Sequence, residues 1–296
     1  SNLEGTIYRN VRSTVKKSHD AIKTHFPKTM RRNGGYNIDR VGGENVSDLT
    51  QILVGSEGTL ATTTSVKLNL VPIPKHTALA VVHFTELNQA MEATVATLEE
   101  SPSAVEHIGS LIIDQARNSL GFSSSLGFIQ GEPRELLIVE FSGDDEREVH
   151  DRTRHLEVRL KRSRMGYAVT KLFKNADKRQ VWAMRQAGLG LMMRVEGNAK
   201  PLPFVEDTAV PPEKLPEYVE GFNEILKRHG TTAGYYGHAS VGCLHIRPII
   251  DTRSLKGQNQ LVSIAREVCE LVLKFNGALT GEHGDGIVRG FWTEKM

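Results

Sequence analysis

The sequence predicts a layered structure of the α/β or α+β class, and two observations support this prediction. From Thr77 onward, short apolar runs typical of strands alternate with longer segments in which apolar residues recur every three or four positions, as on one face of a helix. The composition, with 39% hydrophobic and 24% charged residues, is that of an ordinary globular protein. A length of 296 residues is enough for about two domains.

The expected elements divide the chain near residue 74. Residues 1–74 are rich in glycine and turn-forming residues, and they end in Pro72 and Pro74, which mark a natural boundary. Beyond this boundary the apolar runs predict strands at 77–84, 134–143, 167–173, 202–207, 232–238 and 243–248. We expect Pro248 to stop the last of these strands. The helical patterns predict helices over 86–100, 144–163, 176–195, 212–229 and 256–275.

Charge and cysteine content argue against several functional classes. The net charge of +2 is too small to indicate binding to nucleic acid or a membrane surface. The most basic run, residues 152–164, has Leu156 and Leu160 four positions apart, which favours a solvated helix face over a partner-binding patch. Cys243 and Cys269 are too few for an iron–sulfur or zinc–cysteine site, and a reducing compartment, the cytoplasm, is expected. We find no apolar run of the roughly 18 residues of a membrane span and no signal-peptide pattern.

The stretch YGHASVGCLHIRP, residues 236–248, places His238 and His245 seven positions apart. On one straight strand, two residues an odd number apart point to opposite faces. The small residues ASVG, which include Gly242, can form a turn that brings the two rings together. The pattern therefore predicts that something is held between the rings.

A second stretch, NGALTGEHGDGIVRG, carries Glu282 and His283 in a glycine-rich loop, and such glycine density indicates a special backbone path. Beside His238 and His245, Glu282 would complete a set of two histidines and one carboxylate that suits Zn²⁺, Mn²⁺ or Fe²⁺. His283 would then be free to act as a general base near neutral pH. The alternative is that these are packed or exposed histidines, since the chain has 11 of them and no HExxH motif.

The stretch VGSEGTLA, residues 54–61, is a turn bracketed by glycines. Its backbone N–H groups could face a phosphate or a ring carbonyl, or the turn could be a structural hairpin; neither a Walker loop nor GxGxxG is present. Arg185 and Lys200 are candidate carboxylate binders, with surface cations as the alternative. Arg247 follows His245 by two positions, so both share one face of a strand, and Arg247 is the best-placed cation of the three.

Four motifs in this order, GSEGTLA, WAMR, GHASVGCLH and GEHGDG, resemble the FAD-linked D-2-hydroxy acid dehydrogenases of the vanillyl-alcohol oxidase fold. That group includes D-lactate, glycolate-oxidase-subunit and D-2-hydroxyglutarate dehydrogenases, and this chain looks most like the long bacterial members with a following iron–sulfur domain. The resemblance implies an α+β fold. It implies the later half of an FAD domain in residues 1–74, an antiparallel-sheet, helix-covered substrate (cap) domain in 75–275, and a return segment with the active-site loop in 276–296.

The resemblance also implies roles for individual residues. The implied metal ligands are His238, His245 and Glu282, and the implied base beside the flavin is His283. The implied cations for substrate carboxylates are Arg185 and Lys200, joined by Arg247. The implied FAD contacts are Asn33, Gly35, Tyr36, Ser56, Glu57, Gly58 and Thr59.

Several positions depart from the family pattern. Val241 and Cys243 replace the Asp and Asn of GHxGDGNLH, and Leu189 stands where D-2-hydroxyglutarate enzymes tend to have a Thr. Arg247 stands where an Asn often contacts the substrate. An additional arginine suits a second carboxylate, so D-2-hydroxyglutarate is the first expected substrate and D-lactate the other.

The resemblance implies oxidation of a D-2-hydroxy acid to the 2-oxo acid by metal-assisted hydride transfer to FAD. Electrons would then pass to an iron–sulfur domain or a quinone chain, and a 4Fe-4S cluster is expected only outside this chain. A peripheral association of the parent protein with the inner face of the membrane and a homo-oligomer are compatible with the family, whereas a nucleic-acid partner is not expected.

We expect the chain to be a fragment that is inactive alone, because the pyrophosphate loop of the FAD domain has no counterpart in it. A metal-dependent hydrolase, using the same histidines and Glu282 to activate water, is one alternative. A non-catalytic interaction module is the other.

Overall fold

The computed structural model describes residues 2–41 and 48–295. Its strands are β1 His76–Phe84, β2 Ala104–Gly109, β3 Glu135–Gly143, β4 Ala168–Leu172, β5 Lys200–Pro201, β6 Thr208–Ala209, β7 Ala233–His238 and β8 Cys243–Ile250. Within the described residues they form one eight-stranded sheet in the order β4-β1-β3-β2-β7-β8-β5, and β6 pairs with β8. All of the pairings given for these strands are antiparallel.

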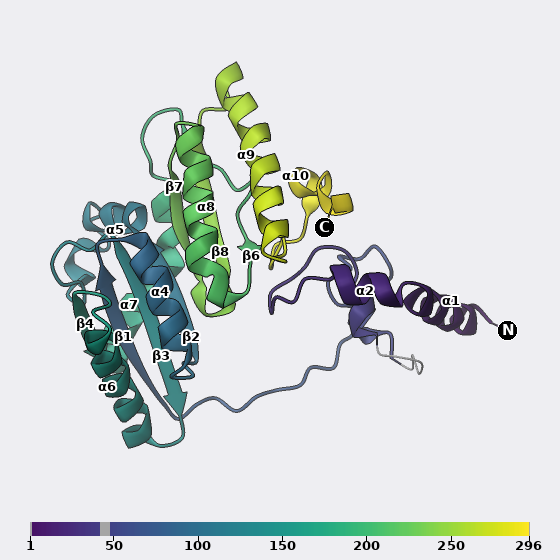
Figure 1. Cartoon of the computed structure of the whole chain (residues 1–296). Helices are drawn as coiled ribbons and strands as arrows, with labels where there is room; N and C mark the ends of the chain where they lie inside the picture. The colour runs from purple at the N-terminus through teal and green to yellow at the C-terminus, as the bar shows by residue number, and fades with distance from the viewer. Residues whose placement is uncertain (1, 42–47, 296) are drawn as a thin grey trace.

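Helices cover both faces of this sheet (Figure 1). One face packs against α4 Leu87–Leu98, α6 Glu146–Arg162, α8 Leu215–Arg228 and α9 Leu255–Lys274. The opposite face packs against α5 Ser110–Arg117 and α7 Asn175–Met192. Successive strand residues alternate between the faces, so in β8 Leu244 and Ile246 join the first core while His245 and Arg247 point to the α5–α7 side.

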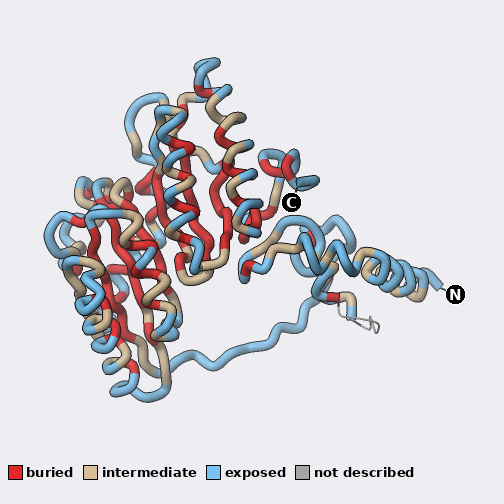
Figure 2. The backbone as a smooth tube through the Cα atoms, in the orientation of Figure 1, coloured by how far each residue is buried: buried red, intermediate tan, exposed pale blue. Residues whose placement is uncertain are grey.

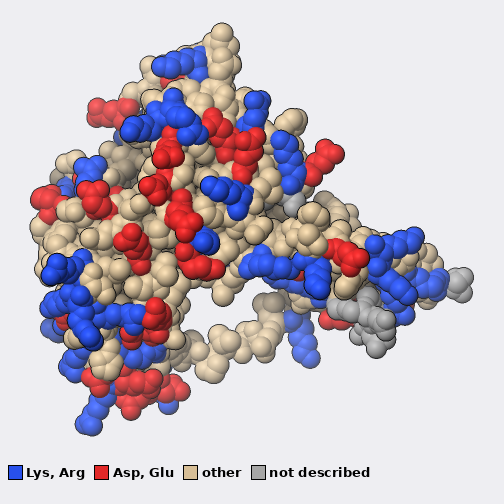
Figure 3. Space-filling model, in the orientation of Figure 1, with Lys and Arg blue, Asp and Glu red and all other residues tan. Residues whose placement is uncertain are grey.

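Most of the predicted elements are confirmed within a few residues, namely β1, β3, β4, β7 and β8, and α4, α6, α7, α8 and α9. The basic run in α6 is amphipathic as predicted, because Leu156 and Leu160 are buried. Its basic side chains pair with acidic ones, as Lys161 does with Glu157. Basic and acidic side chains lie together at the lower left of Figure 3, where α6 runs in Figure 1.

Two strand predictions are wrong. Residues 202–207 form turns, and only Thr208–Ala209 pairs as β6. Pro248 does not stop β8, which continues to Ile250. The N–H of Ile249 donates to the carbonyl of Thr232, on the side of β8 that faces β7. Because successive N–H groups of a strand point in opposite directions, the backbone nitrogen of Pro248, which carries no hydrogen, faces β5. There the carbonyl of Pro248 accepts from Leu202, and the strand tolerates the proline.

The sequence patterns missed β2 and α5, because Glu106 and His107 interrupt the short apolar run. They also missed α1 Leu3–Lys17 and α2 His19–His25, which precede the first glycine-rich stretch. The remaining short elements are η1 Ile38–Arg40, α3 Thr50–Leu53, η2 Ser123–Ser125, η3 Pro212–Lys214, η4 Ala239–Val241, α10 Gly286–Gly290 and η5 Thr293–Lys295.

An exposed strap, residues 61–74, joins the N-terminal elements to β1 without regular secondary structure (Figure 2). The N-terminal elements return to the rest of the molecule at the glycine-rich loop of 281–286, where the N–H of Asn33 donates to the carbonyl of Thr280 at 2.8 Å. Among the described residues, no helix is long and apolar enough to cross a membrane.

Candidate metal and substrate site

The β7–β8 hairpin brings His238 and His245 together, with ring centroids 5.4 Å apart. Residues that lie opposite each other in this hairpin are separated by an odd number of positions in the sequence; Tyr236 and His245 are one such pair. Two residues seven apart therefore share one face, which a straight strand would not allow. The turn uses η4 and Gly242, whose φ of 69° lies in the left-handed region. A Cβ at Gly242 would meet the carbonyl oxygen of Val210 at 1.8 Å, so a glycine is required.

The glycine-rich loop reaches the same face and is held there by Asp207. Its carboxylate accepts the backbone N–H of Glu282 at 2.9 Å and of His283 at 2.8 Å. Asp207 has a positive φ of 71° and is fully buried. The local sequence pattern does not indicate this role for Asp207, because the run of 202–207 predicts a strand.

The three predicted metal ligands converge. The ligand atoms of His238, His245 and Glu282 all lie within 4.8 Å of one another. Oε1 of Glu106 lies 2.7 Å from Nδ1 of His238. The other ring nitrogen of His238, Nε2, faces Oε2 of Glu282 at 3.3 Å. A carboxylate behind the second nitrogen of a histidine is a common support for a metal ligand.

His245 fits a metal in a further respect. It is 4% exposed, and its buried Nδ1 has no hydrogen-bond partner in the described structure. Burial, followed by the neighbouring His283 and His238, lowers the pKa of His245 to about 3. The ring is therefore neutral near pH 7 and offers a lone pair, as a metal ligand must.

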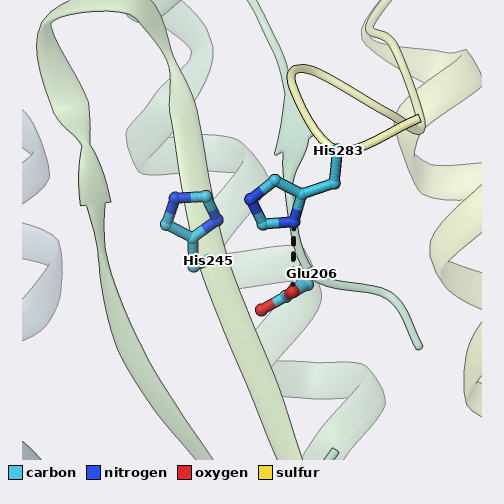
Figure 4. Close-up of side chains that lie close together, drawn as sticks. All are labelled: Glu206, His245 and His283. Carbon is cyan, nitrogen blue, oxygen red and sulfur yellow. Dashed lines mark ion pairs between the residues drawn. The ribbon is translucent and has the colours of Figure 1, made fainter. Parts of the chain in front are cut away.

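His283 stacks on His245, with centroids 5.0 Å apart and the ring planes 6° from parallel (Figure 4). Its Nδ1 lies 3.2 Å from Oε1 of Glu206. Two further sets of ligand atoms are as closely spaced as the first, Glu206 with His245 and His283, and Asp207 with Glu282 and His283.

Two of the three predicted cations lie at this site. Arg185 donates to Glu106 through Nε at 2.8 Å and Nη2 at 2.7 Å, and its guanidinium lies 5.0 Å over the ring of Tyr236. Arg247 donates from Nε to Oε2 of Glu206, and both side chains are buried.

Lys200 lies elsewhere. It pairs with Ile250, five residues beyond His245 along β8, which is about 16 Å at the usual rise of a strand. Its Nζ donates to the carbonyl of Val195 at 2.5 Å.

The predicted FAD contacts gather at the glycine-rich loop. The hydroxyl groups of Tyr36 and Thr59 are 2.9 Å apart, and Thr59 also donates to the carbonyl of Ser56 at 2.6 Å. Nδ2 of Asn33 donates to the carbonyl of Glu282 at 2.8 Å. The side chain of Glu57 comes so close to Gly284 that a Cβ there would meet Oε1 at 2.0 Å.

Two of these predicted contacts leave room for a flat ligand. Gly35 and Gly58 have φ of 67° and 76°, and no atom lies within 4 Å of where their Cβ would stand. Beside Gly35 is a cavity of about 410 Å³, lined by residues of α2 and by Gly34, Gly35, Tyr36, Thr280 and Asp285 among others. Bare backbone beside a cavity fits one part of an FAD molecule.

Four residues at the site escaped the sequence analysis: Glu106, Glu206, Asp207 and Tyr236. For Glu106, Glu206 and Asp207, the sequence signal is an acidic residue within an apolar run. Glu106 lies in VEH, and Glu206 and Asp207 lie in FVED. Acidic residues buried in such runs need a partner, and that is what marks them.

The chain is similar to several known proteins over most of its length. D-2-hydroxyglutarate dehydrogenase of Escherichia coli is 34% identical over 295 residues, covering 95% of this chain and 29% of that protein. D-lactate dehydrogenase of Archaeoglobus fulgidus is 26% identical over 259 residues, covering 85% of this chain and 54% of that protein. The solved 4-ethylphenol oxidase of Gulosibacter chungangensis superposes on 73% of this chain and 47% of that chain, with a TM-score of 0.49 and 13% identity.

Fold and site together define an α+β protein with a histidine–carboxylate cluster on one face of an antiparallel sheet. The chain belongs to the family described as FAD linked oxidases, C-terminal domain, whose model matches residues 73–296. The predicted family and fold class are thereby confirmed. The chain spans 29% of the length of the D-2-hydroxyglutarate dehydrogenase it matches.

Proposed function

We propose that this chain provides the metal and substrate side of an FAD-dependent D-2-hydroxy acid dehydrogenase. The substrate would be D-2-hydroxyglutarate, with D-lactate as the second candidate, in keeping with the names of the two relatives. The observation that carries the proposal is the cluster of His238, His245 and Glu282 beside His283, with ligand atoms within 4.8 Å.

In this proposal His238, His245 and Glu282 hold one divalent ion, of which zinc is the first candidate and manganese or iron the others. Such an ion supplies Lewis acidity toward a substrate hydroxyl group. FAD supplies the hydride acceptor, and Asn33, Gly35, Tyr36 and the 56–59 turn form part of its binding surface.

The residues of the chain then have separate tasks. Nε2 of His283 takes the proton of the substrate hydroxyl, because Nδ1 faces Glu206 at 3.2 Å. Arg247 contacts Glu206 through Nε, and its guanidinium binds a substrate carboxylate through Nη. Arg185 lies over the ring of Tyr236 and orients the other carboxylate. Lys200, which lies apart from the cluster, stays a predicted substrate contact.

Other features of the parent protein are proposed on the same basis. Residues 1–74 would belong to the FAD domain, 75–275 to the substrate domain and 276–296 to the active-site return segment. Electron transfer to an iron–sulfur domain or a quinone chain, a location in the cytoplasm or at the inner face of the membrane, and a homo-oligomer are further proposals.

The test begins with the metal content of the purified chain, measured by mass spectrometry after loading with zinc or manganese. We expect about one equivalent, lost in His238→Ala and in His245→Ala because each removes one of three ligands. His155→Ala, a change at an exposed histidine on α6, should keep the metal.

The second arm uses the FAD-loaded protein that contains this chain. D-2-hydroxyglutarate should bleach the flavin absorbance, and the two ligand variants should lose this reaction. Turnover of an ester without flavin would instead indicate the metal-dependent hydrolase. A chain that binds no metal, in a protein whose flavin no 2-hydroxy acid reduces, would refute the proposal.

A further inference from the structure

Glu206 connects two groups of the site, His283 and Arg247. It lies in the turn before β6 and is 4% exposed. Its two carboxylate oxygens have different partners: Oε1 lies 3.2 Å from Nδ1 of His283, and Oε2 accepts from Nε of Arg247. The backbone is also held, because Nη1 of Arg289 donates to the carbonyl of Glu206 at 2.9 Å.

The same arrangement occurs a second time across the site. Glu106 accepts from Arg185 at Oε2 and faces Nδ1 of His238 at Oε1. Each glutamate therefore joins one arginine to one histidine, and both histidines lie next to His245. A buried carboxylate is costly unless it is paired, and each of the two glutamates has an arginine and a histidine as partners.

We propose that Glu206 is a positioning residue for His283. Its Oε1 accepts the Nδ1–H of the ring, so the lone pair of Nε2 stays free to take a proton from the substrate. Arg247 fixes the second oxygen and supplies the opposite charge that a buried carboxylate requires. The inference rests on the proposed function in so far as His283 is the base, whereas the tautomer of His283 can be observed independently.

The variant Glu206→Gln distinguishes a role in positioning His283 from a role in packing alone, because glutamine has nearly the same shape as glutamate but different hydrogen-bonding groups. A carboxylate presents two acceptor oxygens, whereas an amide presents one acceptor and one donor. Glu206→Gln can therefore satisfy either Arg247 or the Nδ1–H of His283. If its NH₂ group turns to His283, the ring proton moves to Nε2, which is the nitrogen needed for proton transfer.

The tautomer can be measured by ¹⁵N NMR of the histidine-labelled, metal-free chain, with the His283 signals assigned by their loss in His283→Gln. In the unmodified chain we expect the ring proton on Nδ1. In Glu206→Gln we expect at least part of it on Nε2, and the exposed control Glu224→Gln should leave the spectrum of His283 unchanged. A proton on Nε2 in the unmodified chain would overturn the inference, even if the variant does not fold.

Kinetics of the FAD-loaded protein containing this chain provide the second readout. Glu206→Gln should lower kcat on the order of 10- to 100-fold with KM little changed, because the base is misoriented while substrate binding remains. A loss of thermal stability without a change in kcat or in the tautomer would assign Glu206 a structural role only and overturn the inference. An unmodified protein that does not oxidise D-2-hydroxyglutarate would count against the proposed function, and the NMR result would still decide the position of the proton.

Discussion

Gly242 shows how one residue can decide whether a site forms. It sits between the strands that carry His238 and His245, with a φ of 69°. The carbonyl of Gly242 also accepts from Val210, which ties the turn to the segment after β6. The geometry of the two histidines therefore depends on a residue that touches neither ring.

Gly242→Ala should lower the free energy of unfolding by about 3 kcal/mol, from the left-handed φ and from the clash with Val210. We expect weaker zinc binding as well, because the turn must shift. The measurements are urea unfolding and zinc content. Gly230→Ala is the matched control, since Gly230 has a similar φ of 63° but open space around its Cβ position, and it should cost only about 1 kcal/mol. Equal losses in both variants would contradict the steric argument.

At the scale of secondary structure, the hairpin and the neighbouring β2 supply one working face. Glu106 on β2 lies opposite His238 on β7, and Tyr236 lies opposite His245 on β8. The other face of the same strands is apolar and belongs to the core that also contains α9, which packs against β8 and carries no residue of the site. Burial on both faces makes the sheet a rigid support for the site.

Helix α6 illustrates what holds this support together. Leu156 is fully buried against the sheet, whereas Val158, two positions along, is 56% exposed. Leu156→Ala should cost about 3 kcal/mol in unfolding free energy, because it leaves a cavity in the core. Val158→Ala should change this free energy by less than about 0.5 kcal/mol. Urea unfolding of both variants measures the difference, and similar values would place α6 outside the main core.

At the scale of the whole molecule, the chain consists of a densely packed sheet layer and an N-terminal part that contacts it near the glycine-rich loop. The strap of residues 61–74 between them is exposed along its length. The loop is thus contacted from the sheet by Asp207 and from the N-terminal part by Asn33. The candidate metal site and the candidate FAD surface meet at this loop.

Limited trypsin digestion should cut first after Lys67, in the strap, before any Lys or Arg of residues 76–275. Proteases need an extended backbone, and the strap offers one without breaking secondary structure. Lys161 is the internal control, because its side chain is 71% exposed but lies in α6. Mass spectrometry of the first fragments gives the order, and an earlier cut at Lys161 would contradict the described arrangement.

Local patterns were sufficient for most strands and helices, and they singled out the residues predicted as metal ligands. Apolar periodicity reports on neighbours along the chain, so α6 and β1 were predictable, while β2 was not, because Glu106 and His107 break its pattern. The family motifs then pointed to His238, His245, Glu282 and His283 by position.

The partners of these residues could be found only in the folded chain. Glu106 and His238 are 132 positions apart, and Arg247 and Glu206 are 41 apart, so no local pattern links them. The order of the strands and the left-handed turn at Gly242 bring such residues to one face. Sequence periodicity specifies which face of an element is buried, whereas the register between elements selects the partner of each buried charge.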